Sequence, residues 1–477
     1  MTLLREINQN VRRIMPSQLE RLVRRGEQLR EELRHGVKKP YKNLMDVFWG
    51  DLQGGGVRPL SFVRQVLAAC YYPQLVHSDK LPIDVRERAQ ALLGACEGGS
   101  VGSYAATSGM RHVQESVARF ICQRDGGVPS NPDNIYISTG SQRSIMKVLK
   151  LLVHREGSPP TGVLTPVPGY RSVTMILEAF GAAVVPYHLR EGPGWVLQTE
   201  ELHRALRATE GSCKPTVLYV INPGNPTGHV QSRKSIEEVI RFAAEKKLFL
   251  MADEVYQDMT FGKGQTFVSY KRVLAEMGPP FSHTVELASL HSASKGFMGE
   301  AGLRGGYVEL VNLDPSIIDY VHTLFSTDAG APVSGQLALE LMAQPPRPGE
   351  PSYPIYTQET QAIRAMLVQN VGRALEVLNS LPGVSCQAVE GGAFVFPRLH
   401  LPPRAVQQAQ EAGLEPDLLY CSRLLEEEGL CVAPGCEHGQ MEGTHHLRIS
   451  MATSVERAEE ALRRLTAFHL RFMEDFS

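Results

Sequence analysis

The spacing of apolar residues predicts helices and strands that alternate through most of the chain. Residues from about 16 to 34 place their apolar side chains on one stripe of a helix, and Gly36 follows as a stop signal. A glycine-rich stretch over 50–56 is typical of a loop. From about residue 100 onward, a helix is predicted over 144–154, and short apolar strands are predicted at 135–138, 162–164 and 216–221.

The clearest helix in the pattern spans residues 235–247, where apolar positions recur at helical spacing. Ser235 and Glu238 match a capping box at its start. The next run, 248–252, is apolar without a break, as in strands that are buried on both faces. Such runs between helices indicate a parallel sheet, so we expect an α/β fold.

Prolines concentrate over 345–354 and predict a linker. The chain beyond it is typical of a smaller α+β region, which closes with a helix that starts at Thr453-x-x-Glu456. The inner face of that helix is predicted to carry Ala458, Ala461, Leu462, Leu465 and Phe468. The acidic run over 426–428 is most simply the solvated face of another helix.

Composition indicates an ordinary globular protein. The 477 residues carry a formal net charge of −2, with 43% hydrophobic and 21% charged residues. Whole-chain disorder is excluded, because disorder needs low hydrophobicity and high net charge. The chain lacks the basic footprint of a nucleic-acid binder, and it has no run of about 18 apolar residues that could span a membrane. Composition therefore favours a soluble enzyme or binding protein.

The cysteines and the N-terminus bear on the cellular compartment. The eight cysteines are scattered and form no CxxC pair, which predicts reduced thiols and no structural zinc site. The first residues lack the apolar stretch of a secretory signal. Arg5, Arg12 and Arg13 are only faintly similar to a mitochondrial presequence, because Glu6 and later acids interrupt them. We expect a cytoplasmic protein, with a mitochondrial location as the alternative.

Four polar motifs follow one another in the middle of the chain, at least two of them directly after a predicted strand. They read Asn-Pro-Gly-Asn-Pro-Thr-Gly at 222–228, Asp-Glu-Val-Tyr at 253–256, Ser-Ala-Ser-Lys-Gly at 292–296 and Gly-Leu-Arg-Gly-Gly at 302–306. Taken singly, they suit a turn, a helix cap, a solvated loop and a surface ion pair. Ligands bind beyond the carboxyl ends of parallel strands, so the ordered set indicates a ligand site.

This order of motifs resembles the pyridoxal-phosphate aminotransferases of the aspartate aminotransferase fold, and within them the alanine aminotransferase branch. The segments that carry the resemblance are INPGNPTG (221–228), FLMADEVYQD (249–258), ELASLHSASKGFMGEAGLRGGYVEL (286–310), HGVKKPY (35–41) and RDGGVP (124–129). The resemblance extends from about residue 10 to the C-terminus.

The resemblance implies a large domain, in which helices enclose a mostly parallel sheet of the seven-stranded type, and a small α+β domain built from both chain ends. We assign residues 1–40 to an N-terminal arm, 41–75 and 345–477 to the two parts of the small domain, and 76–344 to the large domain that binds the cofactor. Tyr104 resembles a tyrosine that is donated across a dimer interface, so a homodimer is implied.

The resemblance also implies which residues hold pyridoxal phosphate. Lys295 is implied to form the Schiff base, which needs an amine. Asp253 matches the carboxylate that keeps the pyridinium nitrogen protonated. Asn225 and Tyr256 are implied to donate to the phenolic oxygen, and Tyr170 aligns with the aromatic residue that stacks on the ring. The phosphate is implied to bind cationic and hydroxyl donors and a helix N-terminus, at Ser141, Gln142, Ser292, Ser294, Arg304 and Tyr104.

For the substrate, the resemblance implies that Arg448 binds the α-carboxylate, which its planar fork suits. Gly50 resembles a glycine that touches the same carboxylate, and Asn225 serves both cofactor and substrate. Three histidines are interpreted as structural, because the lysine is already placed for proton transfer: His291, His445 and His446.

Three positions depart from the family pattern. Ser141-Gln142-Arg143 stands where similar enzymes typically begin with Ala-Ser. Tyr170 is followed by Arg171-Ser172-Val173 where the family usually continues Tyr-Pro-x-Tyr, which leaves a core aromatic as the alternative role for Tyr170. Ala331-Pro332 replaces the usual Pro-Pro. These departures bear on the phosphate site and on the pocket wall.

We therefore expect ping-pong transfer of the amino group of L-alanine to 2-oxoglutarate, which gives pyruvate and L-glutamate. An aminotransferase for another 2-amino acid is one alternative, and the residues after Tyr170 and at Ala331 motivate it. A catalytically weak paralogue with a binding role is another, motivated by Ser141-Gln142-Arg143. A pyridoxal-dependent transcription regulator is not expected, because no DNA-binding domain or basic patch precedes the fold. The expected partners are small-molecule substrates and a second copy of the chain.

Overall fold

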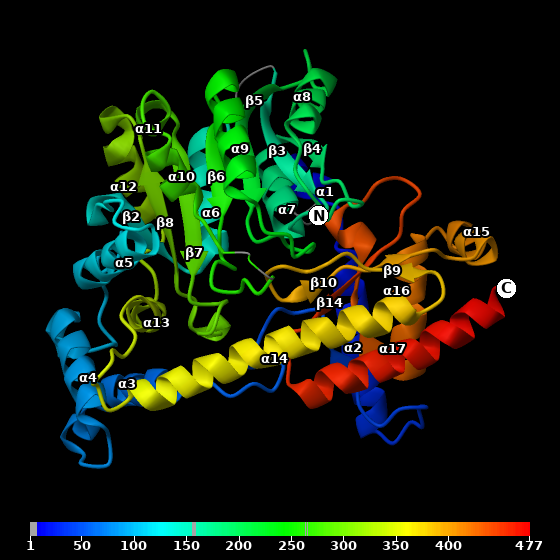
Figure 1. Ribbon diagram of the computed structural model, residues 1–477, viewed down its shortest axis with the longest axis horizontal. Helices are drawn as coiled ribbons and strands as arrows, with labels where there is room; N and C mark the ends of the chain where they lie inside the picture. The colour runs from blue at the N-terminus through cyan, green and yellow to red at the C-terminus, as the bar shows by residue number, and fades with distance from the viewer. Residues whose placement is uncertain (1–6, 155–158, 263, 265) are drawn as a thin grey trace, which may run out of the picture.

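The centre of the molecule is a seven-stranded sheet in the order β2-β8-β7-β6-β5-β3-β4 (Figure 1). The structure is a computed structural model that describes residues 7–154, 159–262, 264 and 266–477. Strands from β4 to β7 run parallel to their neighbours, whereas β8 is antiparallel to both β7 and β2. The predicted mostly parallel sheet is therefore confirmed. Its strands are β2 (Ile135–Ser138), β3 (Thr161–Val167), β4 (Ala183–His188), β5 (Lys214–Ile221), β6 (Phe249–Asp253), β7 (Leu287–Ser292) and β8 (Gly306–Val311).

Helices cover both faces of the sheet, because its strands carry apolar side chains on both sides. Leu218 and Val220 of β5 share a buried cluster with α8, α9 and α10. Val217 and Tyr219 of the same strand point to the other face and share a cluster with α6, α7 and α12. The helices are α6 (Ser141–Leu152), α7 (Arg171–Phe180), α8 (Thr199–Ala208), α9 (Arg233–Lys246), α10 (Tyr270–Glu276), α11 (Phe281–Thr284) and α12 (Ile318–Ser326).

The start of α9 differs from the predicted one. The helix begins at Arg233, and Ser232 caps it by accepting a hydrogen bond from the backbone N–H of Ser235 (3.2 Å). Ser235 and Glu238 therefore lie inside the helix, and the predicted capping box is wrong. Ser232 takes the cap because its extended backbone aims its hydroxyl at the N–H three residues on.

The closing helix, α17 (Val455–Asp475), also starts one residue away from the prediction. Its cap is Ser454, whose hydroxyl accepts from the N–H of Arg457. Thr453 is not the cap, because its hydroxyl donates to the carbonyl of Gly55 instead (2.8 Å). The predicted inner face is correct: Ala458, Ala461, Leu462, Leu465 and Phe468 are all buried.

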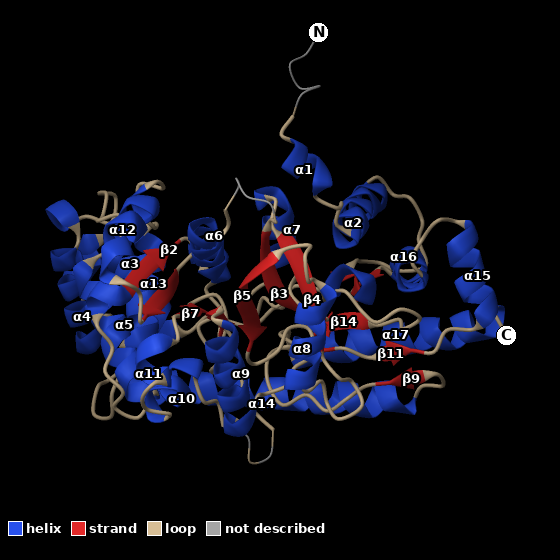
Figure 2. Cartoon of the chain, turned by 90° about the horizontal axis from the view of Figure 1, so that it is seen from above, coloured by secondary structure: helices blue, strands red, loops and turns tan. Residues whose placement is uncertain are grey.

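A second core lies beside the sheet, and both chain ends build it. Buried residues between 22 and 48 form one cluster with residues between 371 and 476, and β1 (Met45–Asp46) pairs parallel with β12 (Leu430–Cys431). The helix α14 (Tyr353–Ser380) packs along α17 (Figures 1 and 2). It follows the proline-rich stretch, whose residues 345–352 contain no helix or strand, as predicted. The last two residues of the predicted linker, Tyr353 and Pro354, instead begin α14. The other elements are α1 (Gln9–Arg13), α2 (Gln18–Arg34), β9 (Val384–Ser385), β10 (Phe394–Val395), β11 (Arg398–Leu399), α15 (Pro403–Glu411), α16 (Pro416–Glu428), β13 (Ala433–Pro434), the 3₁₀ helix η7 (Gly435–His438) and β14 (Leu447–Ser450).

The acidic run at the end of α16 does more than face solvent. Each of its three glutamates forms an ion pair: Glu426 with Arg25, Glu427 with Arg423 (2.7 Å) and Glu428 with Arg471 (2.6 Å). Two of these pairs join α16 to α2 and α17. The expectation of a merely solvated face is wrong, because α16 lies between two helices that carry arginines at this height.

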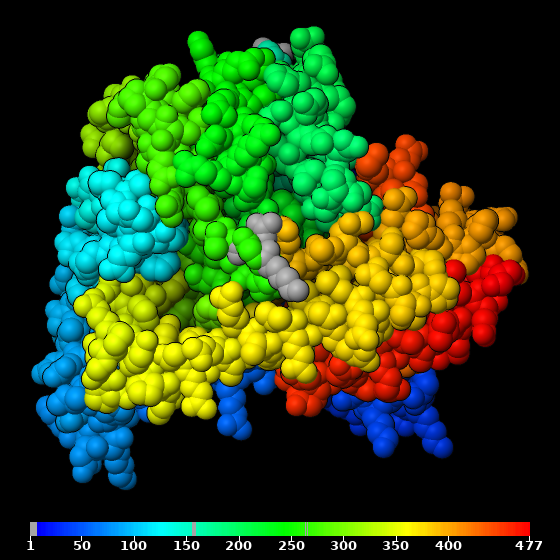
Figure 3. Space-filling view, viewed as in Figure 1, coloured from blue at the N-terminus to red at the C-terminus, as the bar shows by residue number. Residues whose placement is uncertain are grey.

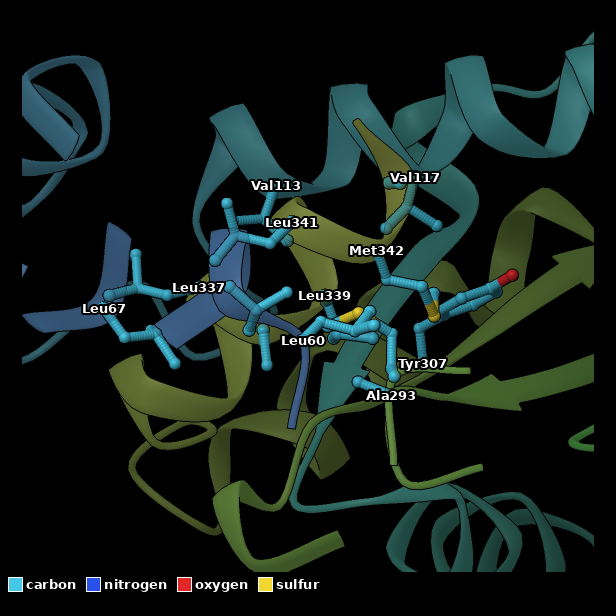
Figure 4. Close-up of a cluster of buried hydrophobic side chains, with 14 of the residues drawn as sticks. Leu60, Leu67, Val113, Val117, Ala293, Tyr307, Leu337, Leu339, Leu341 and Met342 are labelled. Carbon is cyan, nitrogen blue, oxygen red and sulfur yellow. The ribbon is translucent and has the colours of Figure 1, made fainter. Parts of the chain in front are cut away.

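A third cluster links α3 (Ser61–Tyr71), α4 (Ile83–Ala95), α5 (Arg111–Arg124) and α13 (Val333–Ala343). Leu67 from α3, Val113 from α5 and Leu337 from α13 line up in this cluster, together with Ala293 and Tyr307 (Figure 4). It anchors the loop that leads from Ala293 to Lys295. In the space-filling view, α14 runs along the lower edge from α3 and α4 to the C-terminal helix (Figure 3). The domain boundary at residue 75 stays a prediction.

No helix in the described part of the chain is long and apolar enough to cross a membrane. All eight cysteines are free thiols, and most of them are buried. Within the described ranges, no three histidine, cysteine or acidic side chains are grouped so that they could hold a metal ion.

Candidate active site

The motif residues gather at one edge of the sheet, beyond the carboxyl ends of the parallel strands. Asp253 ends β6, and Asn225 follows β5. Lys295 follows β7, and Tyr170 follows β3. Because these strands are parallel, their loops emerge on the same side, which brings together residues that are more than 100 positions apart in sequence.

Lys295 supplies the amine of this site, and its side chain is half-buried. Its Nζ donates to the carbonyl oxygen of Gly50 (2.7 Å) and lies 5.7 Å from the ring centre of Tyr256. Burial, and to a lesser extent the neighbouring Arg448, lower the pKa of Lys295 from 10.5 to about 8, although Asp51 and Asp253 act in the opposite direction. The amine is therefore partly neutral near physiological pH.

Gly50 leaves space for this amine. A Cβ at position 50 would lie 2.8 Å from Cζ of Phe394 and 3.2 Å from Nζ of Lys295. The site requires a glycine at this position, since any side chain would displace the ring or the amine. That Gly50 touches the substrate carboxylate stays a prediction.

Asp253 is a buried carboxyl with few partners. Its side chain accepts from the hydroxyl of Tyr219 (2.9 Å) and from the N–H of Val255 (3.4 Å), and it is 4% exposed. Burial raises the pKa of Asp253 from 3.8 to about 6, while the two hydrogen bonds and Lys295 lower it. In the described structure no cation is bonded to this carboxyl, so it suits a ligand with a positively charged ring nitrogen.

Arg448 and Asn225 form the second polar pair. Arg448 donates from Nη1 to Oδ1 of Asn225 (3.1 Å) and from Nη2 to the carbonyl of Phe48 (2.8 Å). Its guanidinium lies 4.4 Å from the ring centre of Phe394, and its buried Nε has no hydrogen-bond partner. The guanidinium of Arg448 and the amine of Lys295 thus donate to carbonyls that lie only two residues apart on one backbone segment.

A cationic cup forms at the N-terminus of α6. Gly140 precedes the helix with φ 83°, and no side chain caps the first N–H groups. Arg304 crosses this terminus: its Nη2 donates to the carbonyl of Thr139 (3.4 Å) and would lie 2.4 Å from a Cβ at position 140. Ser141 and Gln142 occupy the first turn. A helix N-terminus beside a guanidinium suits a phosphate group.

Other predicted phosphate ligands are arranged around this cup. Ser292 ends β7 and pairs in register with Gly306, next to Arg304. Its hydroxyl accepts from the N–H of Ser294 (3.4 Å). Arg143 turns away and pairs bidentately with Asp328, so the unusual arginine leaves the first turn of α6 open.

Tyr104 stands apart from the other predicted residues. Its side chain is 83% exposed and lines none of the cavities described below. The structure therefore does not bring Tyr104 into the site of its own chain.

Two cavities open beside Tyr170. One has a volume of about 520 Å³ and is lined by Trp49, Tyr170, Arg448 and part of α2. The other has about 380 Å³ and reaches Tyr219, the partner of Asp253. Among the predicted site residues, Tyr170 lines both cavities and Arg448 lines the larger one, whereas Lys295 lines neither.

The sequence interpretation missed His438, which lines both cavities. Its Nδ1 bonds the carbonyl of Gly169 (3.0 Å), and its buried Nε2 has no partner. Burial, and to a lesser extent Arg448, hold its pKa well below the usual value, so this imidazole is neutral. No motif marked it, because its neighbours are distant in sequence.

The three histidines interpreted as structural have contacts that suit that role. His446 stacks on Phe396 with ring centres 4.7 Å apart and bonds Gln440 and Glu191. His291 is buried against Phe120 and Tyr307, and burial lowers its pKa to about 3. His445 is held through its backbone carbonyl, which accepts a hydrogen bond from the N–H of Leu399 (2.7 Å).

Comparison with known proteins identifies this arrangement. The sequence model of the family described as "Aminotransferase class I and II" matches residues 66–465. The chain belongs to this aminotransferase family. The enzyme is 47% identical to alanine aminotransferase 1 of Homo sapiens over 99% of this chain and 95% of that protein. It is equally identical to alanine aminotransferase 2 of Xenopus tropicalis, over 96% of this chain and 87% of that protein.

Solved aminotransferases share the fold of the enzyme. An alanine aminotransferase from Pyrococcus furiosus superposes with a TM-score of 0.76 at 17% identity and covers 98% of this chain and 100% of its own. An aspartate aminotransferase from Thermus thermophilus gives a TM-score of 0.72 at 20% identity, covering 97% and 99%. Aminotransferases of this family use pyridoxal phosphate, which is therefore the cofactor of this enzyme. The unpaired carboxyl of Asp253, the amine of Lys295 and the cup at α6 fit that molecule.

Proposed function

We propose that the enzyme transfers the amino group of L-alanine to 2-oxoglutarate and forms pyruvate and L-glutamate in a ping-pong cycle. The observation that carries the proposal is that Lys295 donates to the carbonyl of Gly50 and Arg448 donates to the carbonyl of Phe48, two residues earlier on the same backbone segment. A carboxylate bound at the guanidinium would place its α-carbon close to the amine. The 47% identity to alanine aminotransferases over nearly the whole chain supports alanine as the donor.

Lys295 and Arg448 would have separate roles in this reaction. When bound, pyridoxal phosphate supplies an electron-accepting ring that makes the α-proton of an amino acid acidic. Lys295 would take up and return that proton, because its pKa of about 8 leaves part of the amine neutral near physiological pH. Arg448 would hold the α-carboxylate of each substrate, with its free Nε as a donor and Asn225 and Gly50 beside it.

The remaining residues would hold the cofactor. Asp253 would keep the ring nitrogen protonated, and Asn225 and Tyr256 would donate to its phenolic oxygen. Tyr170 would cover one face of the ring. The phosphate would bind at the N-terminus of α6, with donors from Ser141, Gln142, Ser292, Ser294 and Arg304.

A panel of L-amino acids assayed with 2-oxoglutarate tests the proposed substrates. We expect L-alanine to rank among the preferred donors. The alternative, another 2-amino acid, is favoured by Arg171 and Ser172, which line the larger cavity. If alanine is a poor donor while another amino acid reacts well, that alternative replaces our proposal.

The binding-protein alternative is tested by the cofactor spectrum. Purified enzyme should show a visible absorbance band from cofactor attached to Lys295, and Lys295→Ala should lose it. Lys234→Ala is the matched control, because the side chain of Lys234 is 86% exposed. A protein that lacks this band would act by binding alone.

The proposal extends to assembly, domains and location. Tyr104 is exposed in its own chain, which suits donation to the phosphate of a second copy, so we propose a homodimer. We also propose that residues 41–75 and 345–477 move together as a small domain against 76–344, with 1–40 as an arm. The eight free thiols favour a reducing compartment, and we propose the cytoplasm. Sedimentation and cell fractionation measure the assembly and the location.

A further inference from the structure

The chain between α1 and α2 lines both cavities beside Tyr170. Residues 15–19, called here the N-terminal strap, comprise the end of the link from α1 and the first two residues of α2. The helix α1 packs beside α7, and α2 packs beside α16 (Figure 2). Pro16 lines both cavities, while Met15 and Ser17 each line one of them. The strap therefore lies on the same walls as Tyr170 and Arg448.

Glu437 holds one end of the strap. One carboxylate oxygen accepts from the hydroxyl of Ser17 (2.7 Å), and the other accepts from the N–H groups of Gln18 (2.8 Å) and Leu19 (3.3 Å). Glu437 is 7% exposed, although it lies more than 400 residues away in sequence. Hydrogen bonds from a helix N-terminus to a carboxylate are strong, because the helix dipole adds to the charge.

An ion pair on α7 holds the other end. Glu178 accepts from the N–H of Met15 (3.2 Å), and Arg171 donates to the carbonyl of the same residue (2.9 Å). Arg171 and Glu178 are themselves paired at 3.0 Å. Both backbone groups of Met15 are thus bonded, and the arginine that departs from the family pattern makes one of the bonds.

Glu437 is also tied to the site itself. It lies in η7 next to His438, and the N–H of Gly169 donates to the carbonyl of His438 (2.8 Å). This bond joins η7 to the turn that presents Tyr170. A shift of the strap would therefore be transmitted through Glu437 and His438 to the turn that presents Tyr170.

We propose that the N-terminal strap limits the side-chain size of the amino donor, and that Glu437 and the Arg171–Glu178 pair are the positioning residues that hold it. The proposal rests on the proposed function, because it assumes that Arg448 fixes the donor in the larger cavity. A short side chain leaves the strap in place, whereas a longer one has to displace it. Neither carboxylate acts on the reaction directly.

The test compares Glu437→Ala with wild-type holoenzyme on L-alanine, L-2-aminobutyrate and L-norvaline, each as a half-reaction. We expect the ratio of kcat/KM for norvaline to that for alanine to rise about tenfold, mainly through KM. Hydrogen exchange at the amides of Gln18 and Leu19 should become faster in the same variant. Glu27→Ala is the matched control, because Glu27 is an exposed glutamate of α2 that lines neither cavity.

Glu178→Ala provides an independent second variant if Glu437→Ala does not fold, because it removes the acceptor of the Met15 N–H without touching η7. An unchanged donor ratio together with faster amide exchange would overturn the proposal, and so would unchanged exchange. If wild-type enzyme does not react with L-alanine, the proposed function fails. The strap is then judged by the ratio between the shortest and the longest donor that do react.

Discussion

Burial shifts the pKa values of Lys295 and Asp253 in opposite directions, so that the two values lie much closer together than in water. The pKa of Lys295 falls from 10.5 to about 8, and that of Asp253 rises from 3.8 to about 6. In both residues desolvation is the largest cause, because each side chain is enclosed without a full set of partners. An amine that gains and loses a proton near neutral pH is suited to acid–base catalysis.

The pKa of Lys295 predicts how the cofactor-free protein reacts with pH. Only the neutral amine is nucleophilic, and a lowered pKa means that the neutral form appears as pH rises through about 8 instead of 10.5. The rate at which pyridoxal phosphate attaches to Lys295 should therefore rise and level off with a midpoint near pH 8, as followed by absorbance. A midpoint near 10.5 would show that the site leaves the lysine unperturbed.

Asp253→Asn tests the carboxyl below the ring. The amide has the same shape but cannot stabilise a cation, so the protein should still bind the cofactor while the half-reaction slows by roughly a hundredfold or more. Tyr219→Phe is the matched control, because it removes only one hydrogen bond to the carboxyl. It should slow the reaction far less. Rapid mixing with the amino donor measures both, and equal rates in all three proteins would contradict the assigned role.

The residues of the site differ in how far the sequence could predict them. Asn225 and Asp253 follow adjacent parallel strands, so strand prediction alone places them at one edge of the sheet. Gly50 and Arg448 could be assigned only through the family resemblance, since the bond from Lys295 to Gly50 spans 245 residues and that from Arg448 to Asn225 spans 223. His438 has neither a motif nor a strand end to mark it.

At the scale of elements, strands were predicted more accurately than helix ends. Unbroken apolar runs such as 248–252 mark buried strands directly. Helix caps depend on the backbone angle of a single residue, and the chain offers several serines and threonines near each start. Ser232 and Ser454 form the caps because each has an extended backbone at the position just before the first helical turn.

The cap of α9 gives a test at this scale. Ser232→Ala should lower the free energy of opening of the first turn by about 1 kcal/mol, because the N–H of Ser235 loses its acceptor. Ser235→Ala should change it by only a few tenths of a kcal/mol, since the side chain of Ser235 makes no cap. Amide exchange over residues 233–238 measures the difference. A larger effect of Ser235→Ala would restore the capping box.

At the scale of the whole molecule, the two chain ends form one body that touches the site from outside the sheet. Phe48 belongs to the second core, and Phe394 and Arg448 lie on β10 and β14. The carbonyl of Gly50, two residues after Phe48, accepts a hydrogen bond from Lys295, which follows β7 of the sheet. Sequence patterns could place the elements on either side of the proline-rich stretch. They could not show that η7 and the N-terminal strap meet, because that contact joins residues 17–19 to residue 437.

Subunit mixing tests the homodimer. Lys295→Ala and Tyr104→Ala homodimers, each impaired, are unfolded together and refolded. Hybrid dimers would combine the intact Lys295 of one subunit with the intact Tyr104 of the other, so activity should return to about a quarter of the wild-type level. Refolding each variant alone is the control. No recovery in the mixture would show that Tyr104 does not serve a second copy.

The central claim, alanine transamination at Lys295, is tested most directly by a single half-reaction. Holoenzyme is mixed with L-alanine in the absence of any 2-oxo acid, and the visible band of the bound cofactor is followed. The band should fade and pyruvate should appear in an amount equal to the bound cofactor, with D-alanine and Lys295→Ala giving neither change. A band that persists with L-alanine but fades with another L-amino acid would contradict the account.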